Sequence, residues 1–265
     1  MVQFGLTWFG TGVILNAGWL LFKKRRNFRL FTDPPALKLA VIIAVLEGIA
    51  TVAFYLAIRE MENPAIVSFI GNLGPVLVTL MGISILGEKY NFIQVGGIIL
   101  ALGGVFAITF FPGTDLDMIV QPGSQYVLFA SMLFAIATIL ARKKREMLDP
   151  ELMSTIRSVL LFLVFILIFL IRGAQLSIEK KVWADIIAGS FLETLLTIVF
   201  AYQALRYIEA AKTSVVISMK AVWVLFGALI FLKTFPSNLE LTGGFLSLTG
   251  LVMISLGKYY RSRRT

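Results

Sequence analysis

Nine apolar stretches of helix length constrain this chain more than any other feature. Each is about twenty residues long, the length that an α-helix needs to cross the hydrocarbon core of a bilayer. Short connections rich in Pro, Gly, Asp or basic residues separate them. The sequence therefore predicts an all-α, polytopic membrane helix bundle with nine transmembrane helices, at residues 3–22, 37–58, 64–87, 91–111, 124–141, 152–171, 183–205, 211–232 and 239–257.

Composition supports this class and weighs against an enzyme. Of the 265 residues, 58% are hydrophobic and 15% are charged, whereas soluble domains have ~45–50% apolar and ~25% charged residues. The chain has no histidine and no cysteine, which removes the commonest general base and metal ligand and all thiol chemistry. No HExxH motif or metal-like cluster appears. We expect no catalytic residues, no metal and no cofactor.

The net charge of +9 is distributed as short basic clusters between the apolar stretches. Such clusters set orientation in a membrane rather than form a stripe that binds nucleic acid. Counted on alternate sides of the nine spans, 17 Lys and Arg residues fall on one side and 5 on the other, with Arg157 and Lys220 inside spans. This asymmetry predicts a cytoplasmic C-terminus and an outside N-terminus, in the plasma membrane.

An internal repeat divides the chain. A shift of 147 residues overlays FYLAIREMENP (54–64) on AYQALRYIEAA (201–211), and the same shift pairs three glycines of the span 91–111 with three of the span 239–257. The shift equals five spans, an odd number, so the two copies cross the membrane in opposite senses. Inverted repeats are the construction of many secondary transporters, in which the halves rock around a site near the bilayer midplane. The predicted units are residues 1–115 and 116–265.

The first unit has four predicted helices and the second has five. The span at 124–141 maps to positions before Met1. We therefore expect a ten-helix inverted-repeat fold that lacks its first helix. A genuine nine-helix variant is the alternative, and the sequence upstream of the start would decide between them.

The stretch NPAIVSFIGNLGPVLVTLMGISILGEKYNFIQVGGIILALGGV (63–105) carries a mid-helix proline, Pro75, then Gly87-Glu88 at the helix end and a glycine-rich next helix. In these features the chain resembles the EamA-like branch of the drug/metabolite transporter superfamily. The resemblance implies ten helices in two inverted five-helix units and export or import of small metabolites, often amino acids, by alternating access. The second half departs from the motif, with Val222 and Phe235 at the positions paired with Pro75 and Glu88.

Four spans carry polar residues near their centres: Glu47, Asn72, Glu193 and Lys220. A charge at this depth costs ~2.5–3.5 kcal/mol on insertion scales, so such residues usually face a cavity or a partner. The repeat puts the two carboxylates on equivalent helices, one position out of register. We expect all four to point inward and to bind the substrate. The family's cavity is lined by the helices corresponding to 37–58, 64–87, 124–141, 183–205 and 211–232.

Lys220 has two readings. In the functional reading, Lys220 anchors a substrate carboxylate or phosphate, or forms a pair with Glu193 or Glu47. In the structural reading, it belongs to a buried ion pair that only fixes helix packing. Burial disfavours the ionised form of a carboxylate, so Glu47 and Glu193 are candidates for binding and releasing a coupling proton. The rival reading is that both are structural partners of Lys220.

Neutral groups near these positions are further candidates for substrate binding: Asn72, Gln203, Tyr55, Tyr202 and Trp223, with Trp8 and Asn16 as weaker ones. Tyr55 and Tyr202 lie near span ends, where an aromatic belt also places tyrosine. Trp8 and Trp223 either wall the cavity or face the bilayer.

Small residues four apart form stripes on two helices, Gly97 with Ala101 and Gly243 with Ser247. Such stripes let helices approach closely, within the chain or at the face of a homodimer. Pro75 removes one backbone hydrogen bond and predicts a kink, either at a gate or as static packing.

These features favour a secondary-active transporter of a small, amino acid-like or other organic solute, with proton coupling open. An exporter of amphiphilic cationic drugs is the alternative, because two carboxylates would favour a cation. A non-transporting membrane partner protein is the third reading. It would pack the polar centres together and leave no pocket.

Overall fold

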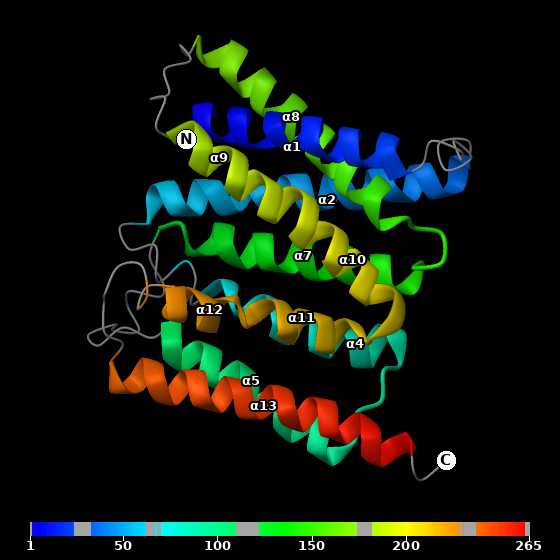
Figure 1. The fold of residues 1–265 in the computed structure, drawn as a ribbon, viewed down its shortest axis with the longest axis vertical. Coiled ribbons are helices and arrows are strands. Elements are labelled where there is room, and N and C mark those ends of the chain that lie inside the picture. Colours follow the sequence, from blue (N-terminus) through cyan, green and yellow to red (C-terminus); the bar gives the residue numbers. More distant parts are fainter. Residues whose placement is uncertain are drawn as a thin grey trace. The chain divides into compact units, whose positions relative to one another are not determined.

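The fold is that of a computed structural model, which describes residues 2–23, 33–61, 67, 70–109, 122–173, 182–227, 230 and 237–262 (Figure 1). Every regular element assigned in these residues is a helix. The elements are α1 (Val2–Lys23), α2 (Pro34–Glu60), α4 (Leu73–Leu86), α5 (Phe92–Thr109), α7 (Ser124–Lys143), α8 (Pro150–Arg172), α9 (Val182–Ser190), the π-helix η2 (Phe191–Thr197), α10 (Ile198–Tyr207), α11 (Ala210–Ser218), α12 (Lys220–Gly227) and α13 (Asn238–Ser262).

The predicted spans correspond to these helices. Five helical runs among the described residues are long and apolar enough to cross a membrane: Val2–Phe22, Pro34–Glu60, Ser124–Lys143, Pro150–Ile171 and Val182–Tyr207. Shorter apolar helices at Leu73–Leu86, Phe92–Ala107 and Leu241–Ile254 lie within three other predicted spans. The all-helical architecture is confirmed. The count of nine crossings stays a prediction, because several predicted spans extend beyond the described residues.

Large apolar side chains lie on the outer surface of the helices rather than only in the interior. Ile14, Phe22, Leu170 and Ile171 are all strongly exposed. A soluble protein rarely exposes many large apolar side chains side by side, whereas lipid tails solvate them readily. The exposure pattern is therefore that of a multi-pass membrane protein.

Local sequence signals define the ends of α8. The carboxylate of Asp149 accepts a hydrogen bond of 3.0 Å from the backbone N–H of Leu152, and Pro150 occupies the first turn. Gly173 ends the helix with φ +57, in the left-handed region where a Cβ is disfavoured. These caps fix the register of α8 and hence the depth of its interior side chains.

The described chain separates into two compact units. Unit 1 consists of Met1–Ile49 and Leu140–Tyr207, and unit 2 of Ala50–Ile139 and Ile208–Thr265. Each unit combines parts of both predicted repeats. Helix α2 belongs to both units, because the chain passes from one to the other between Ile49 and Ala50 within this single helix.

Unit 1 is built on the pairing of α1 with α8, which run side by side (Figure 1). The rings of Phe9 and Phe165 stack there with centroids 5.6 Å apart. Helix α10 also packs on α8. Arg142 donates to the carbonyl of Leu205 at 2.6 Å, so a basic side chain satisfies a carbonyl in the last turn of α10.

Unit 2 contains a very close helix pair, α5 with α13 (Figure 1). A Cβ built on Gly97 would lie 2.7 Å from the carbonyl oxygen of Gly250. Ser247 donates to the carbonyl of Ala101 at 3.2 Å. The small-residue stripes that include Gly97, Ala101, Gly243 and Ser247 therefore face one another inside this unit, where glycine lets the two backbones touch.

Two helices of unit 2 are interrupted at positions that the sequence repeat makes equivalent. Asn72 precedes α4 with φ −69 and ψ −7, and Met219 separates α11 from α12 with φ −61 and ψ −8. The interrupted helices pack against each other through α4 and α11. Pro75 lies in the first turn of α4, just after the break. A proline has no N–H, so it cannot donate to the carbonyl four residues before it, and an interruption at this place is the expected result.

Candidate functional site

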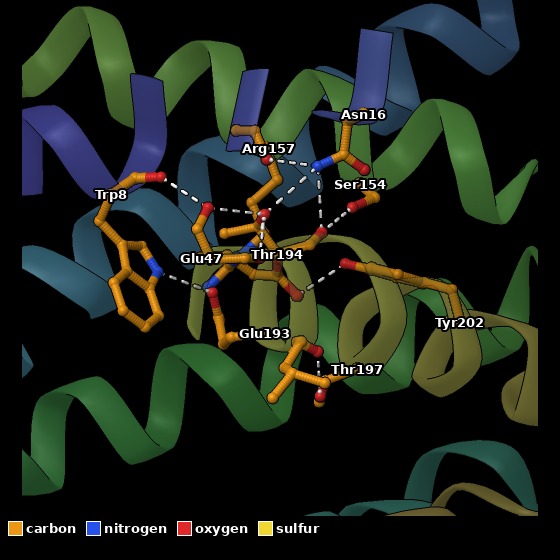
Figure 2. Close-up of polar contacts among 12 residues, drawn as sticks. Trp8, Asn16, Glu47, Ser154, Arg157, Glu193, Thr194, Thr197 and Tyr202 are labelled. Carbon is orange, nitrogen blue, oxygen red and sulfur yellow. Dashed lines mark hydrogen bonds and ion pairs between the residues drawn. The ribbon is translucent and has the colours of Figure 1, made fainter. Parts of the chain in front are cut away.

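Two carboxylates and one guanidinium meet inside unit 1 (Figure 2). Nε of Arg157, on α8, lies 3.1 Å from Oε2 of Glu47 on α2. Nη2 of Arg157 lies 3.5 Å from Oε1 of Glu193 in η2. The three residues come from three helical runs that are long enough to cross a membrane. We call Glu47, Arg157 and Glu193 the ion cluster.

The members of the ion cluster differ in accessibility. The side chain of Arg157 is 7% exposed and that of Glu47 is 13% exposed, whereas that of Glu193 is 38% exposed. Glu47 is also the nearer carboxylate to the guanidinium. Glu47 and Arg157 therefore form the buried pair, and Glu193 is the more exposed carboxylate.

Each carboxylate also accepts a hydrogen bond from a neutral aromatic donor. The hydroxyl of Tyr202, on α10, donates to Oε1 of Glu47 at 2.6 Å. The indole Nε1–H of Trp8, on α1, donates to Oε2 of Glu193 at 3.2 Å. Hydrogen bonds to an ionised acceptor are about twice as strong as neutral ones. The two donors hold the carboxylates at opposite ends of the cluster (Figure 2).

The charges of the ion cluster do not balance. Counted within these three side chains, with all of them ionised, two carboxylates face one guanidinium, a net charge of −1. A net negative charge inside a membrane is costly, so a proton or an organic cation bound at Glu193 would relieve it. The described residues hold no group of three or more His, Cys, Asp or Glu side chains that could hold a metal ion.

Glu193 lies in η2, and its backbone does not follow an ordinary α-helix. The N–H of Ile198 donates to the carbonyl of Glu193, five residues back, and bypasses that of Thr194. The carbonyl of Thr194 instead accepts hydrogen bonds from Asn16 on α1, at 3.2 Å, and from Ser154 on α8. π-turns of this kind often occur at functional sites.

Trp8 lies against α9 because a glycine faces it. A Cβ on Gly189 would collide with the six-membered ring of the indole. Ser190 donates to the Trp8 carbonyl at 2.8 Å, and the ring of Phe4 lies 5.0 Å from that of Trp8. Phe4 is exposed and Trp8 is half-buried. Glu193 therefore has an aromatic neighbour in Trp8.

The family to which the chain belongs indicates the function of this arrangement. The sequence profile of the EamA-like transporter family matches residues 2–110 and 121–256. The chain belongs to the EamA-like transporter family. This family is one of transporters, not of enzymes, and the resemblance predicted from residues 63–105 is confirmed.

Two further similarities agree with the EamA-like assignment. An uncharacterized transporter of Synechocystis, sll1164, is 25% identical over 253 residues, which cover 91% of this chain and 70% of the relative. A solved crystal structure matches with a TM-score of 0.78 at 13% identity, over 96% of this chain and 87% of the other. That likeness supports the membrane helix bundle and says nothing about substrate.

In this EamA-like chain, three of the predicted substrate residues come together in unit 1. Glu47, Glu193 and Tyr202 belong to the ion cluster or donate to it. Gln203 follows Tyr202 on α10 and is half-buried. Both carboxylates have Arg157 as a partner, a residue to which the sequence analysis assigned no pairing.

The other predicted substrate residues belong to unit 2. Asn72 is buried at the helix break and Tyr55 is half-buried. Lys220 begins α12 with an exposed side chain, and Trp223 is exposed beside Phe226, with ring centroids 6.2 Å apart. Because these residues lie in the other unit, their part in binding and a pairing of Lys220 with the carboxylates stay predictions.

Sequence reasoning gave Arg157 no role beyond noting a basic residue inside a span. Arg157 lies about two turns into α8. From that depth a long side chain can reach the membrane surface by snorkelling. The signal available in the sequence was the pair of mid-span carboxylates, which need a buried cation. Lys220 is nearer to a span centre and is the candidate that the sequence favours.

A second polar cluster lies at one end of unit 2. Oε1 of Glu88, just after α4, accepts a hydrogen bond of 2.8 Å from the N–H of Ala210 in the first turn of α11, and Tyr90 donates to the other oxygen. Lys212 pairs with Glu209 at 3.0 Å and lies over the Tyr90 ring at 5.8 Å. A carboxylate at a helix N-terminus satisfies a free N–H and the helix dipole, so we assign this cluster a structural role.

Proposed function

We propose that the protein is a secondary-active transporter of a small organic solute that carries a protonated amine, and that Glu193 is the carboxylate that binds it. The observation that supports this most is the division within the ion cluster: Glu47 neutralises buried Arg157, and accessible Glu193 brings the excess negative charge. An ammonium group at Glu193 would complete the charge balance. The neighbouring Trp8 indole could contact the same cation through its ring.

The transport cycle that we propose is alternating access between two inverted repeats, residues 1–115 and 116–265. The interrupted helices at Asn72 and Met219 support it, because paired helix interruptions at repeat-equivalent positions recur in inverted-repeat transporters. We place the protein in the plasma membrane with a cytoplasmic C-terminus, on the asymmetry of its basic residues. A homodimer is not needed for this cycle.

Coupling to protons is part of the proposal. A proton and an ammonium ion would compete for Glu193, since either one removes the excess charge. Release of a bound amine on one side would then be favoured by protonation of the same carboxylate. A pH gradient across the membrane can drive transport in this way.

An amino acid and an amphiphilic cation are the two solute classes that this site supports. The amino acid needs a second anchor for its carboxylate, for which Lys220 is the predicted residue. The amphiphilic cation needs only Glu193 and the aromatic side chains of Phe4 and Trp8. Three matched probes separate them: phenylalanine, phenethylamine without the carboxylate and 3-phenylpropanoate without the amine.

The test is thermal stabilisation of detergent-purified protein by each probe, followed by uptake of the binding probe into proteoliposomes under an imposed pH gradient. We expect phenethylamine to stabilise the wild type and 3-phenylpropanoate to have no effect. Stabilisation by phenylalanine as well would favour the amino acid class. Glu193→Gln should strongly reduce both stabilisation and uptake, with weak residual binding at high amine concentration, while the protein stays folded. Binding of 3-phenylpropanoate alone, binding by no amine, or full uptake by Glu193→Gln would contradict the proposal.

A further inference from the structure

The π-turn that contains Glu193 has a specific cause in its surroundings. Asn16 and Ser154 are each 1% exposed, and their donor groups point at the carbonyl of Thr194 (Figure 2). Buried polar groups must find partners, because an unsatisfied donor costs about 1–3 kcal/mol. In an α-helix, Ile198 would occupy the Thr194 carbonyl. The π-turn sends the Ile198 N–H to Glu193 instead and leaves the Thr194 carbonyl to the two side chains.

Asn16 is held in place through donation only. Its Nδ2 donates to Gly12 at 2.8 Å, to Thr194 at 3.2 Å and to Ser158 at 3.3 Å. Its Oδ1 is buried and has no hydrogen-bond partner among the described residues. The Oδ1 acceptor of Asn16 is unused, whereas its Nδ2 donor makes three hydrogen bonds. The role of this side chain is therefore that of a donor. That donor fastens α1 to the backbone of η2.

The repeat shows what the π-turn changes. Tyr55 and Tyr202 are 147 positions apart, whereas Glu47 and Glu193 are 146 apart. The difference of one residue arises between Glu193 and Tyr202, and η2 occupies the start of that interval. The corresponding part of α2 is an uninterrupted α-helix. A π-turn is the way in which a helix accommodates one extra residue without breaking.

We propose that Asn16 and Ser154 are positioning residues for Glu193. Their hydrogen bonds to the Thr194 carbonyl hold the π-turn, and the π-turn directs the Glu193 carboxylate toward Arg157 and the Trp8 indole. The inference rests on the proposed function only in that Glu193 binds the solute. The orientation of Glu193 can be measured without any solute, so the two can fail separately.

The test compares Ser154→Ala and Asn16→Ala with a matched control, Thr155→Ala. Thr155 neighbours Ser154 on α8 and is also buried, but its hydroxyl donates to the carbonyl of Glu151 within α8. All three variants are made in a background in which Trp19, Trp183 and Trp223 are replaced by Phe, so that Trp8 is the remaining tryptophan. Ultraviolet resonance Raman spectra then report the hydrogen bond of the Trp8 indole N–H.

We expect Ser154→Ala to weaken the Trp8 hydrogen-bond signature and Thr155→Ala to leave it at the wild-type position. Asn16→Ala should have the larger effect, since it also releases α1. Retention of the wild-type signature in folded Ser154→Ala and Asn16→Ala, or an equal change in Thr155→Ala, would overturn the proposal. If Asn16→Ala does not fold, Ser154→Ala decides alone. We expect that variant to fold, because the Thr194 carbonyl keeps its hydrogen bond from Asn16.

A double-mutant cycle on transport gives a second, independent readout. Ser154→Ala should raise the apparent KM of the binding amine roughly five- to tenfold and change the maximal rate by less than about twofold. In the Glu193→Gln background, residual binding measured by thermal shift should be unchanged by Ser154→Ala, because a positioning residue acts through the group that it positions. Equal losses in both backgrounds would show a general structural role and contradict positioning.

Discussion

Tyr202 donates its phenolic hydrogen to Glu47 across 2.6 Å and joins α10 to α2 within unit 1. The same carboxylate pairs with Arg157 through its other oxygen. Tyr202 thus stabilises the ionised form of Glu47, which in turn neutralises the guanidinium. We predict that Tyr202→Phe lowers the free energy of unfolding by about 1.5–3 kcal/mol, the range for a hydrogen bond to a charged group. Thermal unfolding in detergent measures this, and an unchanged midpoint would exclude the bond.

Arg157 should be the member of the ion cluster that matters most for stability. Arg157→Met removes the guanidinium that the two carboxylates share, and breaking a buried pair costs about 3–5 kcal/mol. We expect little folded protein from this variant. Adding Glu47→Gln removes one of the stranded charges and should recover folded protein, as judged by size-exclusion chromatography. No recovery would mean that Arg157 acts through packing rather than charge.

Glu47→Gln separates stability from binding. Arg157 keeps Glu193 as its counter-ion in this variant, so we expect the protein to fold. The excess negative charge is gone, however, and Glu193 must now neutralise the guanidinium. Thermal-shift titration with phenethylamine should therefore show at least tenfold weaker binding, as for loss of about 1.4 kcal/mol. Wild-type affinity would show that Glu193 does not depend on the charge of its neighbour.

Gly189 controls the position of Trp8. A methyl group there would collide with the indole, so Gly189→Ala should push Trp8 away from Glu193 and weaken amine binding severalfold. Gly18→Ala is the matched control. Gly18 lies on α1, and a Cβ built on it meets nothing within 4 Å. Titration of both variants with phenethylamine makes the comparison. Equal affinities would remove Trp8 from the site.

The close pairing of α5 with α13 gives a prediction for stability alone. Gly104→Ala places a methyl group against the backbone of Gly243 and the side chain of Ser247, and we expect a loss of about 1–3 kcal/mol, as for overpacking in a core. Gly103→Ala, next to it in the chain, meets nothing within 4 Å and should be neutral or slightly stabilising. Thermal unfolding of the pair is the measurement, and the same midpoint for both would contradict the packing.

Much of the fold could be predicted from the sequence because one physical constraint dominates it. Backbone in lipid must satisfy its own hydrogen bonds, so apolar stretches of helix length become helices. The same reasoning found Glu47 and Glu193, since charged groups deep in a span need partners. It could not find which cation they share, because α8 brings Arg157 to them from a position that also suits a surface residue.

The π-turn was beyond sequence reasoning for a different reason. Its cause is a contact of the Thr194 carbonyl with Asn16 and Ser154, which are far from it in the chain. Residues 191–197 read locally as ordinary helix. The one visible sign was the register of the two carboxylates, which differs by one position from the rest of the repeat. That offset becomes interpretable only when the backbone is seen.

The paired interruptions at Asn72 and Met219 have a consequence for engineering. The two positions share nearly the same dihedral angles, yet a proline follows only the first, and Val222 stands where Pro75 would be. The proline ring is therefore not required for such an interruption. A designer who replaces Pro75 to ease membrane insertion should find the interruption at Asn72 still there, because Met219 has nearly the same backbone geometry without a proline in the following turn.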